Sequence, residues 1–207
     1  MLPPLAPEHA RAVVASLDRT HVLVVGDAML DLFIAGRVAR LSPEAPVPVV
    51  LFDHESHRIG GAANVAHNVA ALGGRSTLVA VVGHDEAATT LVNACHDAGI
   101  TPALIRAADR RTTTKMRIVT ERNQQVARVD YEVDTEIAGD IEREVIAAVQ
   151  LHAADASAIV ISDYLKGCLT TSVIRAAISV GRERGIPVLV DPKIPHIGAY
   201  SGATVVT

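Results

Sequence analysis

The sequence alternates short apolar runs, rich in Val, Ile and Leu, with longer stretches of helical character. The runs cover residues 21–25, 78–82, 158–162 and 187–191, and most of their positions are apolar. Such a run is typical of a strand that is buried on both faces, as in a parallel sheet with helices on both sides. We therefore predict an α/β fold built on a doubly wound, mostly parallel sheet, with 21–25 as a central strand.

Helices are expected in the intervals, at about residues 64–72, 85–99, 140–152 and 170–185. The second begins with Asp85 and Glu86, whose charges suit a helix N-terminus. Thr170 or Thr171 provides an N-cap for the fourth, and Gly185 provides its stop.

Two segments, about residues 36–58 and 112–133, break this alternation. Their apolar residues occupy alternate positions, as in Val47, Val49 and Leu51, which is typical of strands with one exposed face. We predict that the two segments form a small β lid inserted into the parallel domain. Because a lone two-stranded ribbon is only marginally stable in water, we also predict that the lid pairs with a second copy of the chain as a homodimer.

The last five residues, 203–207, have the composition of a further buried strand, and no helical stretch follows them. A doubly wound sheet covers such a strand with a helix. The expectation is therefore a partial domain over residues 1–207, truncated on its C-terminal side. The alternative is a short edge strand at a natural terminus.

Charge and composition exclude several classes of protein. The net charge of −4 argues against a nucleic-acid partner, and no apolar run approaches the roughly 18 residues of a membrane span. Residues 1–5 lack the basic and apolar regions of a signal peptide. The two cysteines, Cys95 and Cys168, are far apart, so a reduced, cytoplasmic setting is expected, without a disulfide framework.

Polar residues follow several predicted strands, where an open parallel sheet binds its ligands. Only three residues in the chain are Lys, against 16 Arg, and all three lie in such clusters or on the lid, which favours phosphate contacts. The candidate site residues are Asp27 and Asp31, Gly60, Gly61 and Asn64, Lys115 on the lid, Asp163 and Lys166, and Lys193.

Other motifs are absent. The chain has no GxxxxGK[ST] phosphate loop and no GxGxxG fingerprint, so a nucleotide-dependent oxidoreductase is the least favoured class. His54 and His57 flank Glu55 but lie in the lid, outside any helical HExxH motif, and no metal ligand is assigned. Cys168 has no visible base beside it that would make it a nucleophile.

At these residues the chain resembles the ribokinase (PfkB) superfamily of carbohydrate kinases. Within the superfamily it is most similar to the bacterial D-glycero-β-D-manno-heptose 7-phosphate kinases. The Ser-Pro-Glu-Ala-Pro-Val-Pro-Val run and the Asn-Gln-Gln run are more specific to these kinases than the Gly-Gly-Ala-Ala-Asn stretch is. The resemblance covers nearly the whole chain through residues 24–31, 42–50, 60–66, 114–117, 123–125, 128–130, 162–167 and 190–193.

The resemblance implies a ribokinase-like fold and transfer of the ATP γ-phosphoryl group, with Mg²⁺, to the anomeric hydroxyl of heptose 7-phosphate. The product is the 1,7-bisphosphate, on the route to ADP-heptose for lipopolysaccharide core. The superfamily's catalytic base lies in a Gly-Ala-Gly-Asp segment, which the 207 residues do not contain.

The resemblance also implies roles for single residues. Asp27, Asp31 and Asn64 bind sugar hydroxyls, and Gly60 and Gly61 let the backbone approach. The 7-phosphate is bound by Lys115, Arg117 and Arg128, which lie on neighbouring lid strands. Asp163 and Lys166 lie at the junction of sugar and phosphate, and Lys193 supports catalysis by facing the transferred phosphoryl group.

Two alternatives stay open. The chain is another PfkB-family sugar kinase, or it is a catalytically incomplete fragment that binds a sugar phosphate or dimerises. A substrate panel separates the first alternative from heptose phosphorylation, and the missing Gly-Ala-Gly-Asp segment favours the second.

Overall fold

A computed structural model describes residues 6–207 of the chain. Residues 1–5, on which the expectation about a signal peptide depends, lie outside the described part. Among the described residues, no helix combines the length and the apolar character needed to cross a membrane.

A six-stranded parallel sheet forms the centre of the larger part of the molecule. In spatial order its strands are β10 (Val205–Val206), β9 (Val188–Asp191), β8 (Ala158–Ser162), β1 (His21–Gly26), β4 (Arg75–Val82) and β5 (Ile100–Arg106). The four predicted apolar runs are β1, β4, β8 and β9, and β1 is a central strand, as expected. The strand order reverses around β1, which is the mark of a doubly wound sheet.

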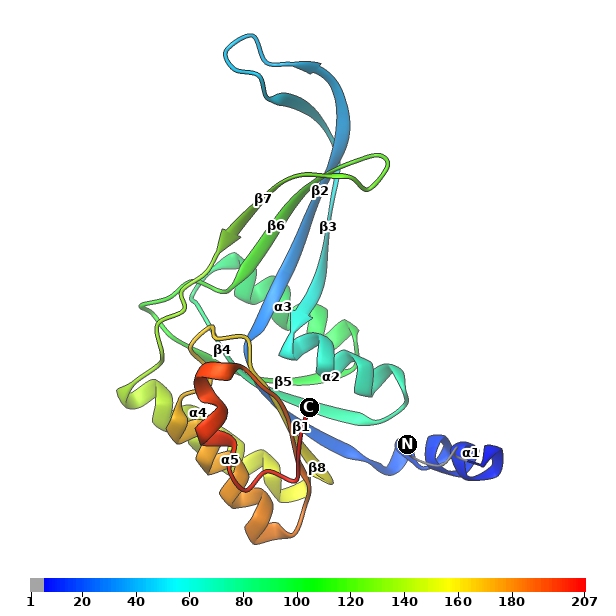
Figure 1. Cartoon of the computed structure of the whole chain (residues 1–207), viewed down its shortest axis with the longest axis vertical. Coiled ribbons are helices and arrows are strands. Elements are labelled where there is room, and N and C mark those ends of the chain that lie inside the picture. Colours follow the sequence, from blue (N-terminus) through cyan, green and yellow to red (C-terminus); the bar gives the residue numbers. More distant parts are fainter. Residues whose placement is uncertain (1–5) are drawn as a thin grey trace.

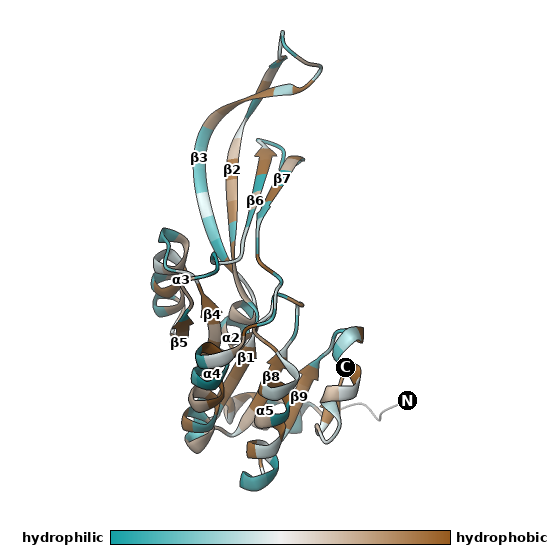
Figure 2. Cartoon of the chain, turned by 90° about the vertical axis from the view of Figure 1, so that its left-hand side faces the viewer, coloured by the Kyte–Doolittle hydropathy of each residue, from teal (hydrophilic) through white to brown (hydrophobic). Residues whose placement is uncertain are grey.

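Helices cover both faces of this sheet. Alternate residues of β1 divide between two apolar cores: Leu23 and Val25 pack toward α4 (Gly139–His152) and α5 (Thr171–Arg184). Val24, on the opposite face, packs toward α2 (Ala62–Ala71) and α3 (Glu86–Asp97). Figure 2 shows the strands between these helices as mostly hydrophobic. Burial on both faces is the physical reason for the continuous apolar runs in the sequence.

The helix ends follow the expected local signals. Asp85 caps α3, its carboxylate accepting a hydrogen bond from the Ala88 N–H, and the Thr170 hydroxyl accepts from the Val173 N–H at the start of α5. Gly185 ends α5 in the left-handed conformation, with φ of 67°. A short helix, α1 (Pro7–Ala15), and the strand β5 were not expected from the sequence.

A second sheet of four strands projects from the first (Figure 1). Its strands lie in the order β3 (Pro48–Gly61), β2 (Ala28–Leu41), β6 (Thr114–Thr120) and β7 (Gln125–Tyr131). Two antiparallel hairpins, β2–β3 and β6–β7, are joined by parallel pairing of β2 with β6. The second sheet begins at Ala28, well before the start of the expected lid segment at residue 36. Residues 36–58 form the outer part of its β2–β3 hairpin.

The expected strand at residues 203–207 is present as β10, a two-residue strand at the edge of the parallel sheet, where Val205 and Val206 are 46% and 44% exposed. Its pairing with β9 explains the β-branched composition, which does not by itself determine burial.

Candidate functional site

The second sheet rises from the carboxyl end of β1, and only Asp27 separates β1 from β2. Strand β8 pairs with β1, and β9 pairs with β8, so the residues that follow these three strands meet at one edge of the parallel sheet. The structure therefore brings together three predicted positions, Asp27, the loop of residues 163–168, and Lys193. The edge where they meet is the one at which doubly wound sheets bind ligands.

The Asp27 carboxylate organises this edge. Its Oδ2 accepts hydrogen bonds from the backbone N–H of Tyr164 (2.8 Å) and Lys166 (3.1 Å), and its Oδ1 accepts from the N–H of Cys168 (3.0 Å). Asp27 is only 3% exposed. Burial, with the nearby charge of Asp163, raises the pKa of Asp27 although the three N–H groups lower it. Asp27 thus fixes the 163–168 loop, a role that the sequence did not suggest.

We expect Asp27→Ala to lower the free energy of unfolding by about 2–3 kcal/mol, because the variant leaves the buried Cys168 N–H without an acceptor and frees two further N–H groups. Urea unfolding measures the change. The matched control is Asp109→Ala, which removes an exposed carboxylate. Equal stability of the two variants would contradict the anchoring role.

Charged side chains cover one face of the second sheet, at the end that adjoins the parallel sheet; we call this the charged face. Residues opposite one another in register share a face, and the register aligns Asp31 with Lys115 and Lys115 with Asp130. It likewise aligns Arg117 with Arg128. Lys115 and Arg117 thus lie on one face, as their spacing predicts.

The cations of this face are held by carboxylates. Arg117 pairs with Asp31 at 2.5 Å and lies over the Phe33 ring, and Arg128 pairs with Asp130 at 2.9 Å. Desolvation by itself raises the pKa of Asp130, but the hydrogen bonds and charges of Arg128 and Lys115 outweigh it and lower that pKa.

Glu132 bridges the two lysines of the charged face. Its carboxylate lies 2.9 Å from Lys166 Nζ and 3.3 Å from Lys115 Nζ, and the hydrogen bond from Lys166 is the first cause of its lowered pKa. The ion-paired group counts four cations (Lys115, Arg117, Arg128 and Lys166) and three carboxylates (Asp31, Asp130 and Glu132), so it keeps one net positive charge. Arg58, which lies opposite Asp31 in register and over the Phe33 ring, adds a further positive charge to the same face.

Gly60 and Gly61, just before α2, are each required for a different steric reason. A Cβ on Gly60 would lie 2.6 Å from Asp31 Oδ2, so Gly60 leaves room for that carboxylate. Gly61 has a φ of 57°, and a Cβ there would lie 2.3 Å from the Asp27 carbonyl oxygen. Asn64 lies on the exposed side of α2, where it lines an open groove of about 580 Å³ with Arg58 and His67.

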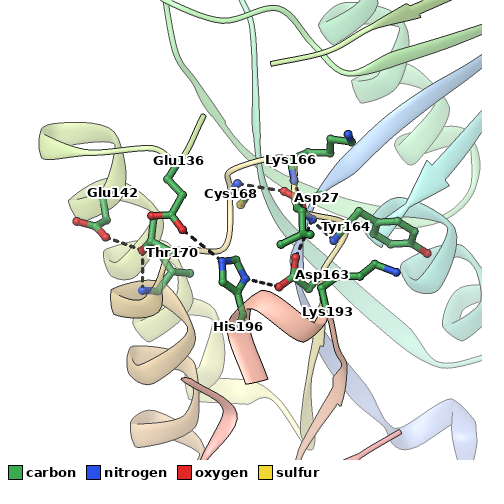
Figure 3. A network of polar contacts seen from close by, with 12 residues as sticks. Asp27, Glu136, Glu142, Asp163, Tyr164, Lys166, Cys168, Thr170, Lys193 and His196 are labelled. Carbon is green, nitrogen blue, oxygen red and sulfur yellow. Dashed lines mark hydrogen bonds and ion pairs between the residues drawn. The ribbon is translucent and has the colours of Figure 1, made fainter. Parts of the chain in front are cut away.

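A second polar cluster surrounds Asp163, which is fully buried (Figure 3). Its carboxylate accepts hydrogen bonds from the Leu165 N–H (2.8 Å) and the Tyr200 hydroxyl (2.6 Å), and its Oδ2 lies 2.5 Å from His196 Nδ1. His196 Nε2 in turn lies 3.3 Å from Glu136 Oε1. Sequence reasoning missed Glu136, His196 and Tyr200, because nothing in their local spacing marks them.

Lys193 lies beside this cluster (Figure 3). Its ammonium group lies 5.5 Å from the centre of the Tyr164 ring, a cation–π distance. Its backbone N–H donates to the Tyr200 hydroxyl oxygen (3.2 Å), which fixes the start of the 3₁₀ segment Ile194–Tyr200.

Within residues 6–207 no group of three or more His, Cys, Asp or Glu side chains has the arrangement of a metal site. The carboxylates of the charged face are occupied by Lys and Arg side chains. The described residues therefore do not fit a protein-held Mg²⁺ ion.

Comparison with known proteins gives a consistent picture. Residues 19–204 match the family described as pfkB family carbohydrate kinase. The chain is 45% identical over 186 residues to "Bifunctional protein HldE" of Citrifermentans bemidjiense, and the match covers 89% of this chain and 38% of that protein. It is 42% identical over 200 residues to the protein of the same name in Geobacter sulfurreducens, covering 97% of this chain and 41% of that protein. The chain thus spans about two fifths of the length of these relatives.

Solved structures share the fold. A carbohydrate kinase from Agrobacterium tumefaciens superposes with a TM-score of 0.68 at 19% identity, covering 90% of this chain and 60% of that chain. The tetrameric inhibited form of phosphofructokinase-2 from Escherichia coli superposes with a TM-score of 0.66 at 20% identity, covering 87% and 57%. At these identities the likeness is one of fold.

Proposed function

The chain belongs to the pfkB family of carbohydrate kinases, and we propose that within this family its 207 residues bind the sugar phosphate of a heptose 7-phosphate kinase. The observation that carries the proposal is the charged face beside the carboxyl ends of β1, β8 and β9, with its net positive charge. The family implies ATP as the phosphate donor. The identity to HldE proteins and the resemblance of residues 42–50 and 123–125 to heptose 7-phosphate kinases support the choice of sugar.

In the proposed mechanism the chain positions the acceptor. Lys115, Arg117 and Arg128 bind the 7-phosphate, since a charge-assisted hydrogen bond to a phosphate is stronger than a neutral one. Asp31 orients sugar hydroxyls, and the Asp27-anchored loop carries Lys166 to the junction of sugar and phosphate. Lys193 faces the phosphoryl group that ATP donates. Positioning and charge stabilisation are the main contributions to phosphoryl transfer, and Mg²⁺ is proposed to enter with the ATP phosphates.

Calorimetry with a panel of sugars tests the proposal. Heptose 7-phosphate should bind more tightly than heptose, and more tightly than fructose 6-phosphate or ribose 5-phosphate. Preference for another sugar phosphate would favour a different sugar kinase of the family, and equal binding of heptose and its 7-phosphate would contradict the phosphate site. The two cysteines are free and buried, which suits the reducing cytoplasm that we propose as the location.

The homodimer is a further part of the proposal. The outer half of the β2–β3 hairpin exposes five apolar side chains to solvent, Val38, Leu41, Val47, Leu51 and Phe52, with exposed fractions between 41% and 66%. Exposed apolar groups gathered on one element favour association. A second copy, presenting the same hairpin, is the partner that we propose.

We expect sedimentation at micromolar concentration to show a dimer that Phe52→Asp dissociates, because the substitution places a charge in an apolar contact. Leu151→Asp on α4 is the matched control, since Leu151 is 69% exposed and lies away from the hairpin. A monomeric parent chain, or equal dissociation of both variants, would count against pairing through the hairpin.

A further inference from the structure

His196 lies between two carboxylates, one at each ring nitrogen (Figure 3). Nδ1 is 2.5 Å from Asp163 Oδ2, and Nε2 is 3.3 Å from Glu136 Oε1. An ionised carboxylate only accepts hydrogen bonds, and a neutral imidazole has a single N–H to donate. Both contacts can therefore be hydrogen bonds at the same time only when His196 is an imidazolium. The geometry of the cluster thus depends on the protonation of one side chain.

Hydrogen bonds connect His196 to Lys193 through Asp163 and Tyr200. The Asp163 carboxylate also accepts from the Tyr200 hydroxyl, whose oxygen in turn accepts from the Lys193 N–H. His196 and Tyr200 therefore hold the 194–200 segment to Asp163 at two points. The backbone of Lys193, which precedes this segment, is fixed by both of them, since its N–H donates to the Tyr200 hydroxyl oxygen and its carbonyl oxygen accepts from the His196 N–H at 3.0 Å.

The Glu136 side of His196 is equally well fixed. The neighbouring Ile137 N–H donates to the Gly167 carbonyl oxygen at 2.9 Å. A Cβ on Gly167, which has a φ of 82°, would lie 2.1 Å from the Thr135 carbonyl oxygen, so the two backbones are in close contact. The backbone around Glu136 is therefore held against the 163–168 loop. His196 attaches the 194–200 segment to both of them.

We propose that His196 is a positioning residue whose protonation holds Lys193 at the site. As an imidazolium it ties the 194–200 segment to both Asp163 and Glu136, and as a neutral ring it releases Glu136. The tie consists of contacts within the chain and does not depend on a bound ligand. Its effect on sugar-phosphate binding rests on the proposed function, in which Lys193 is part of the site.

The sign of the pH dependence follows from the surroundings of His196. Burial by itself lowers the pKa of His196, but the hydrogen bonds and charges of Asp163 and Glu136 outweigh burial and raise it above its ordinary value. The tie is therefore complete below about pH 6.5, the ordinary value for His, and is lost as the pH rises through the higher value of the folded chain. The charged and titratable groups around the ring are Asp163, Glu136, Tyr200 and Lys193, with Asp191 near Tyr200.

An NMR titration of the histidine rings tests the tie without any ligand. The His196→Gln spectrum assigns the His196 resonance, and Glu136→Gln, at a side chain that is 56% exposed, removes one carboxylate with little risk to the fold. We expect His196 to titrate above pH 6.5 in the parent chain and at lower pH in Glu136→Gln. His9→Gln on the exposed helix α1 is the control and should leave the titration unchanged. The proposal would be overturned if His196 titrated at or below pH 6.5, or if Glu136→Gln left the pH of its titration unchanged.

Hydrogen exchange and calorimetry then test the positioning of Lys193. Across the titration of His196, protection of the Lys193 amide, corrected for its intrinsic exchange rate, should fall roughly threefold to tenfold, the range for one hydrogen bond. The affinity for heptose 7-phosphate should fall by a similar factor in the parent chain and be independent of pH in His196→Gln. Constant amide protection would overturn the positioning role. Pronounced loss of protection without any sugar binding would uphold the tie and contradict the proposed function instead.

Discussion

The 207-residue chain alone is expected to transfer no phosphoryl group from ATP to heptose 7-phosphate at a measurable rate. In the superfamily that the chain resembles, a Gly-Ala-Gly-Asp segment supplies the base and an anion hole, and these contributions to catalysis are large. The 207 residues contain one similar string, Ile137–Asp140. Its Asp140 is 83% exposed and pairs with Arg143 in its own helix, so it does not serve as a buried base.

A coupled assay of ATP consumption measures this turnover. Phosphofructokinase-2 from Escherichia coli, with its own substrate, serves as the positive control for the coupling system. Kinases typically turn over at roughly 1–100 per second, and a rate in that range from this chain would contradict the prediction. The 207 residues would then have to contain a base, and the carboxylates at the sheet edge would be the first to test.

Arg117→Ala is expected to remove most of the preference for heptose 7-phosphate over unphosphorylated heptose. A charge-assisted hydrogen bond contributes about 1.5–3 kcal/mol, so the preference should fall roughly tenfold to a hundredfold. Arg117 is held ready by Asp31 and by the Phe33 ring, and so it loses little side-chain entropy when a phosphate binds. Calorimetry with both sugars on parent and variant measures the change.

Two further variants separate the phosphate contact from the ion pair with Asp31. Arg122→Ala removes an exposed cation of the β6–β7 turn and should leave the preference unchanged. Asp31→Asn breaks the ion pair but keeps the cation, so it should weaken both sugars and preserve the preference. If Arg117→Ala keeps the preference intact, the charged face is not the phosphate site.

The charged face also shows why the number of cations alone is a poor guide to anion binding. Each of the four cations already has a carboxylate partner, so an incoming phosphate competes with Asp31, Asp130 and Glu132. The pairs of Glu132 with Lys115 and Lys166 reach solvent, and exposed ion pairs are weak, which makes such an exchange possible for a dianion. Glu132 is the principal competitor, because it contacts both Lys115 and Lys166.

The sequence by itself determined the features that depend on near neighbours. The double-sided burial of β1 appears as an apolar run, and the ends of α3 and α5 follow from Asp85, Thr170 and Gly185. These signals are local, since a cap contacts backbone groups within three or four residues. The same holds for Lys115 and Arg117, whose spacing of two places them on one face of a strand.

Only the tertiary structure decided which distant residues meet. Nothing local indicates that β2 pairs in parallel with β6, or that Asp27 accepts hydrogen bonds from the loop of residues 163–168. His196, Asp163 and Glu136 come from three segments that meet at one sheet edge. Local sequence determines how a segment folds, whereas its partners are selected by the packing of the whole chain.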